Sequence, residues 1–280
     1  MIIKNINSPL RDVKITSDTL FSLPNVLTFP LPHEDLGTLK EIFKDRKKVL
    51  TIAGYGYGFS FLENSQVTAV DKCPMQIAEN LLIKKMILKL EYQQMIDILH
   101  ELSNKKRMTE DMIALFSEGV QPEFKIYVEK TAKELYYHFY GLLFDKKINI
   151  LEFFPFLNER YLFYKIKNSI LQENLKLILG YIPDSLGSII DKNTDSIYLS
   201  NLFDHISSKE KKELCTILGA SNISMVVFAQ IAFPTQQYGK KGFIAEMELL
   251  LRSQGFNECN SFIGQSPLLE TEIKYSILKK

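Results

Sequence analysis

Residues 48–58 read KVLTIAGYGYG, a short apolar run that passes directly into three alternating glycines. A run of this kind is typical of a buried parallel strand followed by a tight turn. A second apolar run, at residues 66–70, reads QVTAV and stops on Asp71. A strand, a glycine turn, a helix, a second strand and an acid form, in this order, the first half of a nucleotide-binding βαβ unit.

The glycine turn and Asp71 together favour a nucleoside ligand. Gly54, Gly56 and Gly58 let backbone N–H groups approach a ligand closely, and the helix that follows presents its positive end. Taken alone, such a turn can equally be structural. Asp71 follows about 20 residues later, where a carboxylate accepts both hydroxyls of a ribose.

The spacing of the glycines indicates which nucleoside is expected. A dinucleotide-binding turn has the pattern G-x-G-x-x-G, whereas this turn is G-x-G-x-G with bulky Tyr55 and Tyr57 inside it. The sequence also lacks the G-x-x-x-x-G-K-[ST] pattern of a P-loop. A turn poorly suited to pyrophosphate favours S-adenosylmethionine (SAM), which has ribose hydroxyls but no phosphate, over NAD or ATP.

Several strings of sequence carry a resemblance to a known family. They are VLTIAGYG at residues 49–56, VTAVDKCPMQ at residues 67–76 and IYLSNLFD at residues 197–204, with Lys84 in the intervening helix. These strings resemble the S-adenosylmethionine:diacylglycerol 3-amino-3-carboxypropyltransferase (BtaA-like) family, within the class I SAM-dependent methyltransferase superfamily. The resemblance covers residues 48–99 and 175–204, and D-x-x-P-x-Q and Y-L-S-N are its more specific parts.

The resemblance implies a fold, a donor and a reaction. The implied reaction moves the 3-amino-3-carboxypropyl group of SAM to an acceptor and releases methylthioadenosine. The sequence departs from the family at Cys73, where the family commonly has Asn. It also has no acid at Thr51 or Ile52, where ordinary methyltransferases often carry one.

The resemblance implies a Rossmann-like class I SAM-methyltransferase fold, and the rest of the sequence agrees with an α/β fold that has a helical insertion after the second strand. Strand-like runs at residues 175–179, 196–200 and 224–230 alternate with helical segments, which indicates a parallel sheet covered by helices. Residues 256–262 and 272–278 fit a closing pair of strands, antiparallel in folds of this type.

The domain prediction follows from the same patterns. Prolines are dense in residues 1–46, which predicts an N-terminal arm or lid. Residues 47–280 are expected to form the SAM-binding domain, with the helical insertion at about residues 84–150.

The predicted site combines the turn, the acid and the ends of two strands. The residues expected to hold the donor are Gly54, Tyr55, Gly56, Gly58, Asp71, Lys72, Gln76 and Asn201. Asp204 and His205 are the catalytic candidates, because ligands of such sheets bind beyond the carboxyl ends of the strands. Asp204 could act as a base or orient a cation, and its alternative role is a helix N-cap. His205 has a suitable pKa, but a lone histidine is more often a surface or packed residue. Asn201 could contact the donor or the acceptor, or cap the next turn.

The composition of the chain limits which partners and which cellular compartment are expected. The 280 residues are 46% hydrophobic and carry a formal net charge of +1, which argues against a disordered chain or a strongly basic nucleic-acid-binding protein. The four histidines and three cysteines have no metal-ligand spacing, so no metal is expected. Without a signal peptide or a membrane-spanning run, the expected compartment is the cytoplasm. The expected partner is a small-molecule or lipid acceptor, and the oligomeric state is left open.

The function predicted is therefore a SAM-dependent transferase of the aminocarboxypropyl type. A conventional SAM-dependent methyltransferase is the first alternative, because the placement of the acceptor decides which carbon is attacked. A non-catalytic SAM-binding sensor or scaffold is the second, because a fold does not by itself imply a function.

Overall fold

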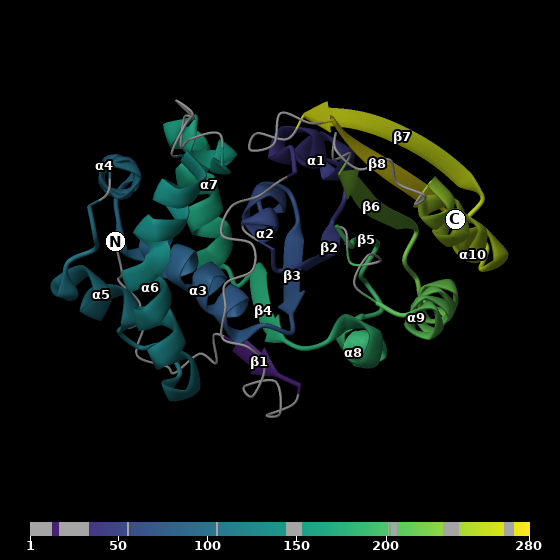
Figure 1. The fold of residues 1–280 in the computed structure, drawn as a ribbon, viewed down its shortest axis with the longest axis horizontal. Helices are drawn as coiled ribbons and strands as arrows, with labels where there is room; N and C mark the ends of the chain where they lie inside the picture. The colour runs from purple at the N-terminus through teal and green to yellow at the C-terminus, as the bar shows by residue number, and fades with distance from the viewer. Residues whose placement is uncertain are drawn as a thin grey trace.

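The computed structural model of the protein describes residues 13–16, 34–54, 56–104, 106–143, 153–200, 202, 206–231, 241–265 and 272–280. Within these residues, eight strands form one sheet in the order β1-β4-β3-β2-β5-β6-β8-β7 (Figure 1). The strands are β1 (Val13–Ile15), β2 (Lys48–Ile52), β3 (Gln66–Asp71), β4 (Leu175–Leu179), β5 (Ser196–Tyr198), β6 (Met225–Ile231), β7 (Glu258–Gln265) and β8 (Glu272–Lys279).

The sheet is parallel from β1 to β6 and closes with an antiparallel pair. β8 runs antiparallel to β6, and β7 runs antiparallel to β8. The chain proceeds outward from β2 to β3 and β4, then returns to β5 on the other side of β2. The order of the strands therefore reverses between β2 and β5, which is where ligands of open α/β sheets bind. This topology confirms the predicted α/β, Rossmann-like fold and its closing strand pair.

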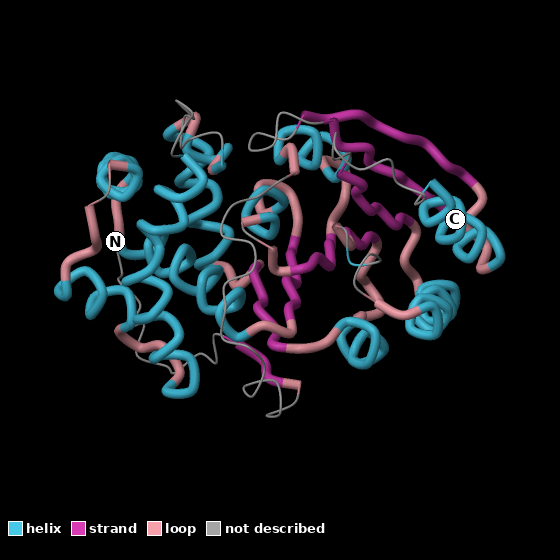
Figure 2. The backbone as a smooth tube through the Cα atoms, in the orientation of Figure 1, coloured by secondary structure: helices cyan, strands magenta, loops and turns pink. Residues whose placement is uncertain are grey.

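Helices cover both faces of the sheet, and Figure 2 shows the strands running between two groups of helices. The first group comprises α1 (Leu36–Phe43), α2 (Tyr57–Phe61), α3 (Pro74–Lys89), α4 (Tyr92–Ser103), α5 (Glu110–Ser117), α6 (Pro122–Leu143) and α7 (Arg160–Leu171), with a short 3-10 helix at Pro155–Leu157. The second group comprises α8 (Ile182–Ile189), α9 (Ser208–Ala220) and α10 (Lys241–Ser253).

The central strands β2 to β6 are largely apolar because each face packs on helices. Val49 and Ala69 belong to the core beneath the first group of helices, whereas their neighbours Leu50 and Val70 belong to the core beneath the second group. Side chains alternate between the faces of a strand, so a strand buried on both faces reads as one continuous apolar run. This is why the strand runs were visible in the sequence.

The helices α4 to α7 lie between β3 and β4 and form, with α3, the bulk of one side of the molecule (Figure 1). They confirm the helical insertion predicted after the second strand of the sequence analysis. The strand β1 was not predicted. It adds to the edge of the sheet beside β4, with Val13 opposite Leu177. The division into residues 1–46 and 47–280 stays a prediction.

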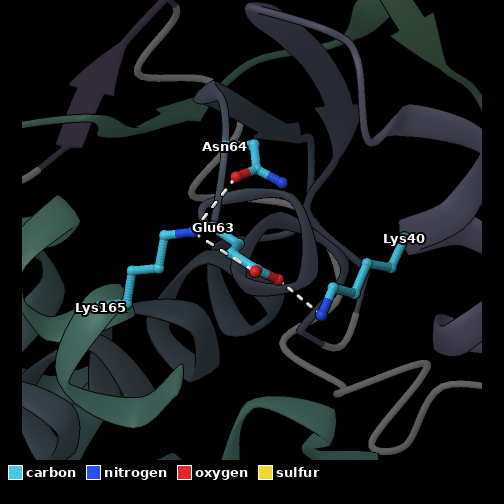
Figure 3. Close-up of polar contacts among 4 residues, drawn as sticks. All are labelled: Lys40, Glu63, Asn64 and Lys165. Carbon is cyan, nitrogen blue, oxygen red and sulfur yellow. Dashed lines mark hydrogen bonds and ion pairs between the residues drawn. The ribbon is translucent and has the colours of Figure 1, made fainter. Parts of the chain in front are cut away.

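A group of charged side chains joins three separate elements (Figure 3). The Glu63 carboxylate, which follows α2, lies 2.5 Å from the Lys40 ammonium of α1 and 3.4 Å from the Lys165 ammonium of α7. Lys165 also donates to Asn64 Oδ1 at 3.3 Å. Burial alone would raise the pKa of Glu63, but the hydrogen bond and charge of Lys40, with Lys165, lower it below its ordinary value. The Glu63 carboxylate is thus paired with two cations, and it links α1 to α7 of the helical insertion.

Candidate functional site

The turn after β2 is shaped by two glycines with different requirements. A Cβ at Gly54 would lie 2.1 Å from Cε2 of Tyr57, so the Tyr57 ring occupies the space of any side chain there. Gly56 has φ of +69°, which side-chain-bearing residues rarely adopt, and open space around it. Both glycines are buried: Gly54 packs against the Tyr57 ring, and Gly56 is needed for its positive φ.

Gly58 has a different environment from the other two predicted glycines. It lies inside α2, where a Cβ would make ordinary contacts of 3.5–3.6 Å with Ala69, Leu175 and Val67. Its small size serves the packing of α2 on the sheet. The structure therefore places Gly58 in α2 and not in the turn itself, and Tyr55 lies outside the described residues.

Asp71 ends β3, next to the glycine turn. The backbone N–H of Ala53 donates to the Val70 carbonyl at 2.8 Å, which sets the end of β2 beside the end of β3. Asp71 Oδ1 accepts a hydrogen bond from the Cys73 N–H at 2.8 Å. Removal from water raises the pKa of Asp71 to about 6, although the Cys73 N–H and the charge of Lys72 favour the ionised form. Other atoms of the residue remain partly exposed. A carboxyl group so placed is suited to accept hydrogen bonds from hydroxyl groups of a ligand.

The first two turns of α3 bring amide and acid groups to the same place. The Gln76 amide donates to Glu79 Oε2 at 2.5 Å, and Asn80 donates to the Ala53 carbonyl at 3.0 Å, immediately before Gly54. Gln76 Oε1 and Glu79 Oε1 are buried and have no hydrogen-bond partner among the described residues. An unpaired buried polar atom costs about 1–3 kcal/mol. Such atoms generally mark the position of a ligand or a water.

Glu79 is a buried acid that the sequence analysis did not single out. Burial raises the pKa of Glu79 well above its ordinary value; the Gln76 hydrogen bond opposes this shift and the charge of Asp71 reinforces it. The influence of Asp71 shows that the two carboxyl groups are electrostatic neighbours. Because Glu79 lies in a helix with apolar residues on all sides, its sequence pattern gave no signal.

Glu34, immediately before the Asp35 N-cap of α1, is a second acid that the sequence analysis missed. Its side chain is buried, with 2% of the residue exposed. Glu34 Oε1 accepts hydrogen bonds from Tyr198 at 3.2 Å and from Ser200, and Oε2 accepts one from Tyr57. Burial, followed by the charge of Glu34, raises the pKa of Tyr57 and Tyr198 well above ordinary values, so both remain protonated donors. No periodicity or motif in the proline-rich N-terminal sequence points to Glu34.

Lys72 is directed away from the turn. Its ammonium lies 5.1 Å from the centre of the Tyr181 ring, at the N-cap of α8. Tyr181 in turn donates to Glu210 Oε1 of α9 at 2.7 Å. The structure thus brings together Gly54, Gly56, Asp71 and Gln76, but sends the Lys72 side chain toward α8 and α9.

The remaining predicted residues, Asn201, Asp204 and His205, lie outside the described residues, so their roles stay predictions. Within the described ranges, no group of three or more His, Cys, Asp or Glu side chains is placed to hold a metal ion. No helix in that part of the chain is both long and apolar enough to cross a membrane.

No protein-family model matches the sequence, and no curated protein matches it. Among solved structures, the chain is similar to a TehB-like SAM-dependent methyltransferase from Corynebacterium glutamicum, with a TM-score of 0.36 and 9% identity over 94% of this chain and 92% of that chain. It is also similar to the pyocyanin biosynthetic protein PhzM, with a TM-score of 0.35 and 10% identity over 86% of this chain and 54% of that chain. The chain therefore spans about half the length of PhzM. Similarities this distant do not identify a ligand or a reaction.

The fold assignment accordingly rests on strand order and register. The fold and the site together define an α/β protein with buried polar groups at the carboxyl ends of three strands. We call the region at the carboxyl ends of β2, β3 and β5 the carboxyl edge.

Proposed function

We propose that this chain is a SAM-dependent transferase whose donor lies across the carboxyl edge. The observation that carries the proposal is Asp71, held one strand away from the glycine turn at Gly54 and Gly56. In this arrangement Asp71 accepts the ribose hydroxyls and the turn faces the amino-acid part of the donor. The unpaired buried oxygen of Gln76 provides a further acceptor at the same edge.

The charges of the edge support this donor over nucleoside phosphates. The charged and amide side chains described above at this edge are the acids Glu34, Asp71 and Glu79 and the amides Gln76 and Asn80, while the Lys72 ammonium lies over the Tyr181 ring. A phosphate group would need cationic or N–H donors, whereas a sulfonium and an ammonium are attracted by carboxylates. The edge therefore suits a cationic nucleoside without phosphates.

The finer proposal is transfer of the 3-amino-3-carboxypropyl group, supported by the family resemblance of residues 48–99 and 175–204. The acceptor nucleophile attacks the carbon that joins the amino-acid part to sulfur. That carbon–sulfur bond breaks with its electron pair going to sulfur, so methylthioadenosine leaves, and the acceptor releases its proton to water or to a base. Asp204 and His205 are the candidates for that base. The protein contributes mainly by aligning the acceptor with one of the three carbons that the sulfonium activates.

Two alternatives use the same fold and donor groups. Attack on the methyl carbon would make the protein a conventional methyltransferase that releases S-adenosylhomocysteine. Binding without transfer would make it a SAM-binding sensor or scaffold. The proposed acceptor in the first two cases is a small molecule or a lipid.

The test is incubation of the purified protein with SAM and an extract of small metabolites and lipids, followed by mass spectrometry of both products. We expect methylthioadenosine together with an acceptor that has gained the mass of an aminocarboxypropyl group. S-adenosylhomocysteine would establish methyl transfer instead, and tight binding without conversion would establish the sensor. Since SAM also releases methylthioadenosine slowly on its own, only the modified acceptor counts as transfer.

The control in this assay is Asp71→Ala, which removes the carboxylate that we place on the ribose. We expect the variant to remain folded and to lose most of its affinity for SAM. Unchanged affinity would contradict the proposed donor site.

A further inference from the structure

Glu34 lies where the order of the strands reverses. Its carboxylate is held by Tyr57 from the turn after β2, by Tyr198 at the end of β5, and by Ser200 just beyond it. These hydroxyl groups are the whole of its hydrogen bonding among the described residues, and it forms no ion pair with any of them.

Among the described residues, no cation pairs with the Glu34 carboxylate. Buried carboxylates are generally paired with a cation, as Glu63 is, but the partners of Glu34 are neutral hydroxyls. A carboxylate has about four acceptor positions, two on each oxygen. Oε1 accepts two hydrogen bonds and Oε2 accepts one, which leaves Oε2 with capacity for another donor.

The position of Glu34 relative to the proposed donor follows from Tyr57 and the sheet. One edge of the Tyr57 ring lies over Gly54, and its hydroxyl reaches Glu34, so one aromatic ring separates the turn from the carboxylate. Asp71 is on β3, on the opposite side of β2 from β5. Asp71 and the β5 residue Tyr198, which donates to Glu34, therefore lie on opposite sides of β2. A donor with its ribose on Asp71 extends its amino-acid part across the turn toward Glu34.

We infer that Glu34 binds the α-ammonium group of the donor through a charge-assisted hydrogen bond to Oε2. This inference rests on the proposed function and assigns the second end of the same site. It makes Glu34 the residue that holds the amino-acid part of SAM, while Asp71 holds the ribose.

The test compares three nucleosides by isothermal titration with the wild-type protein and Glu34→Gln. SAM and S-adenosylhomocysteine both carry the α-ammonium, and only SAM carries the sulfonium charge; methylthioadenosine has the ribose but neither charge. We expect Glu34→Gln to weaken SAM and S-adenosylhomocysteine about ten- to a hundredfold and to leave methylthioadenosine unchanged. Glutamine keeps the size of the side chain and an oxygen for the hydroxyls.

Two control variants separate this role from general effects. Asp71→Asn should weaken all three nucleosides, because all three carry the ribose. Asp35→Asn removes the neighbouring charge while keeping an N-cap for α1, and should weaken none. Should Glu34→Gln fail to fold, Glu34→Asp keeps the charge but shortens its reach, and should weaken only the two amino-acid-bearing nucleosides.

Each other result overturns the inference in a recognisable way. Equal weakening of all three nucleosides by Glu34→Gln would show a structural role. Weakening of SAM alone would show that Glu34 responds to the sulfonium, and weakening of none would exclude Glu34 from the site. A wild-type protein that binds none of the three would instead overturn the proposed function, and the inference with it.

Discussion

The carboxylates of Glu63, which is partly buried, and Glu34, which is buried, have opposite kinds of partners. Glu63 is paired with lysines from α1 and α7 (Figure 3), whereas Glu34 is surrounded by hydroxyl groups of Tyr57, Tyr198 and Ser200. The first lies before the start of β3, the second at the carboxyl edge. The carboxylate of Glu63, which links separate helices, is paired with lysines of the same chain.

In the part of the chain that the structure describes, the acids of the carboxyl edge form no ion pair, although the charge of Lys72 favours the ionised form of Asp71. Asp71 and Glu79 have raised pKa values, chiefly because burial removes them from water. A site that holds acids without cations is costly to the unliganded protein and favourable to a cationic ligand. This contrast supports our proposal that the carboxyl edge binds a ligand, whereas the ion pairs of Glu63 stabilise the fold.

The largest effect is expected from Gly54→Ala, which changes the packing at the carboxyl edge itself. The added Cβ would lie 2.1 Å from Tyr57 Cε2, so the ring must leave its place and its hydrogen bond to Glu34. We expect a loss of about 1–3 kcal/mol in the free energy of unfolding and loss of measurable SAM binding. Denaturant unfolding and calorimetric titration measure the two effects.

The matched control is Gly58→Ala, where the added Cβ would meet ordinary contacts at 3.5 Å or more. Because alanine favours a helix over glycine, this variant should be as stable as the wild type or up to about 1 kcal/mol more stable. Equal damage from both substitutions would show that Tyr57 and the turn have no special role.

The next effect concerns the pH dependence of Asp71, whose pKa is about 6. A ribose donates to the ionised carboxylate, so SAM affinity should fall as pH decreases below about 6, by up to about tenfold per pH unit. In the unliganded protein the sign is opposite. The raised pKa gives a stability contribution that is present below the ordinary pKa and is lost as pH rises through about 6.

Titrations of SAM and unfolding curves between pH 5 and pH 8 measure both trends, with Asp71→Asn as the reference that cannot ionise. If the SAM affinity of the wild type varies with pH in the same way as that of Asp71→Asn, Asp71 does not bind the ligand.

A smaller effect is expected at the junction, from Glu63→Gln. The loss of its ion pairs should cost about 0.5–1 kcal/mol of stability, because these groups are partly exposed, and should leave SAM affinity within about twofold. Since the pKa of Glu63 is lowered, its contribution is present above the ordinary pKa and is lost as pH falls through the lowered value.

The exposed pair of Glu41 and Lys44 in α1 and at its C-cap provides the control for this prediction. Glu41→Gln should produce no measurable change in the unfolding midpoint. A tenfold loss of SAM affinity in Glu63→Gln would break the distinction between the junction and the edge.

The smallest effect is expected from Lys72→Ala. Its ammonium lies over Tyr181, so the substitution removes a cation–π contact worth about 0.5–1 kcal/mol and should leave SAM affinity within about twofold. A tenfold loss in the same titration would show that the Lys72 side chain belongs to the donor site after all.

The sequence predicted the sheet well because its strands are buried on both faces and read as apolar runs. It also predicted that Asp71 and the glycine turn follow neighbouring strands, since the residues of a βαβ unit are close along the chain, and their role in holding a donor stays a prediction. It could not predict β1, which has only three residues, or Glu34, which reaches β2 and β5 through tertiary packing. The predicted role of Lys72 at the donor site stays a prediction, and its ammonium lies over the Tyr181 ring at the N-cap of α8.

The catalytic candidates Asp204 and His205, with Tyr55 and Asn201, remain predictions from the sequence. Their test is the product assay with Asp204→Asn, in which turnover should fall more than donor affinity. Wild-type turnover in that variant would remove Asp204 from the mechanism.

The measurement that tests the account most directly is the affinity of SAM, at pH 7, for the wild-type protein, Asp71→Ala and Glu63→Gln. The account predicts binding to the wild type and to Glu63→Gln with affinities within about twofold, and at least about tenfold weaker binding to Asp71→Ala. Absence of binding to the wild type, or equal affinity for all three proteins, would contradict the assignment of the carboxyl edge as a SAM site.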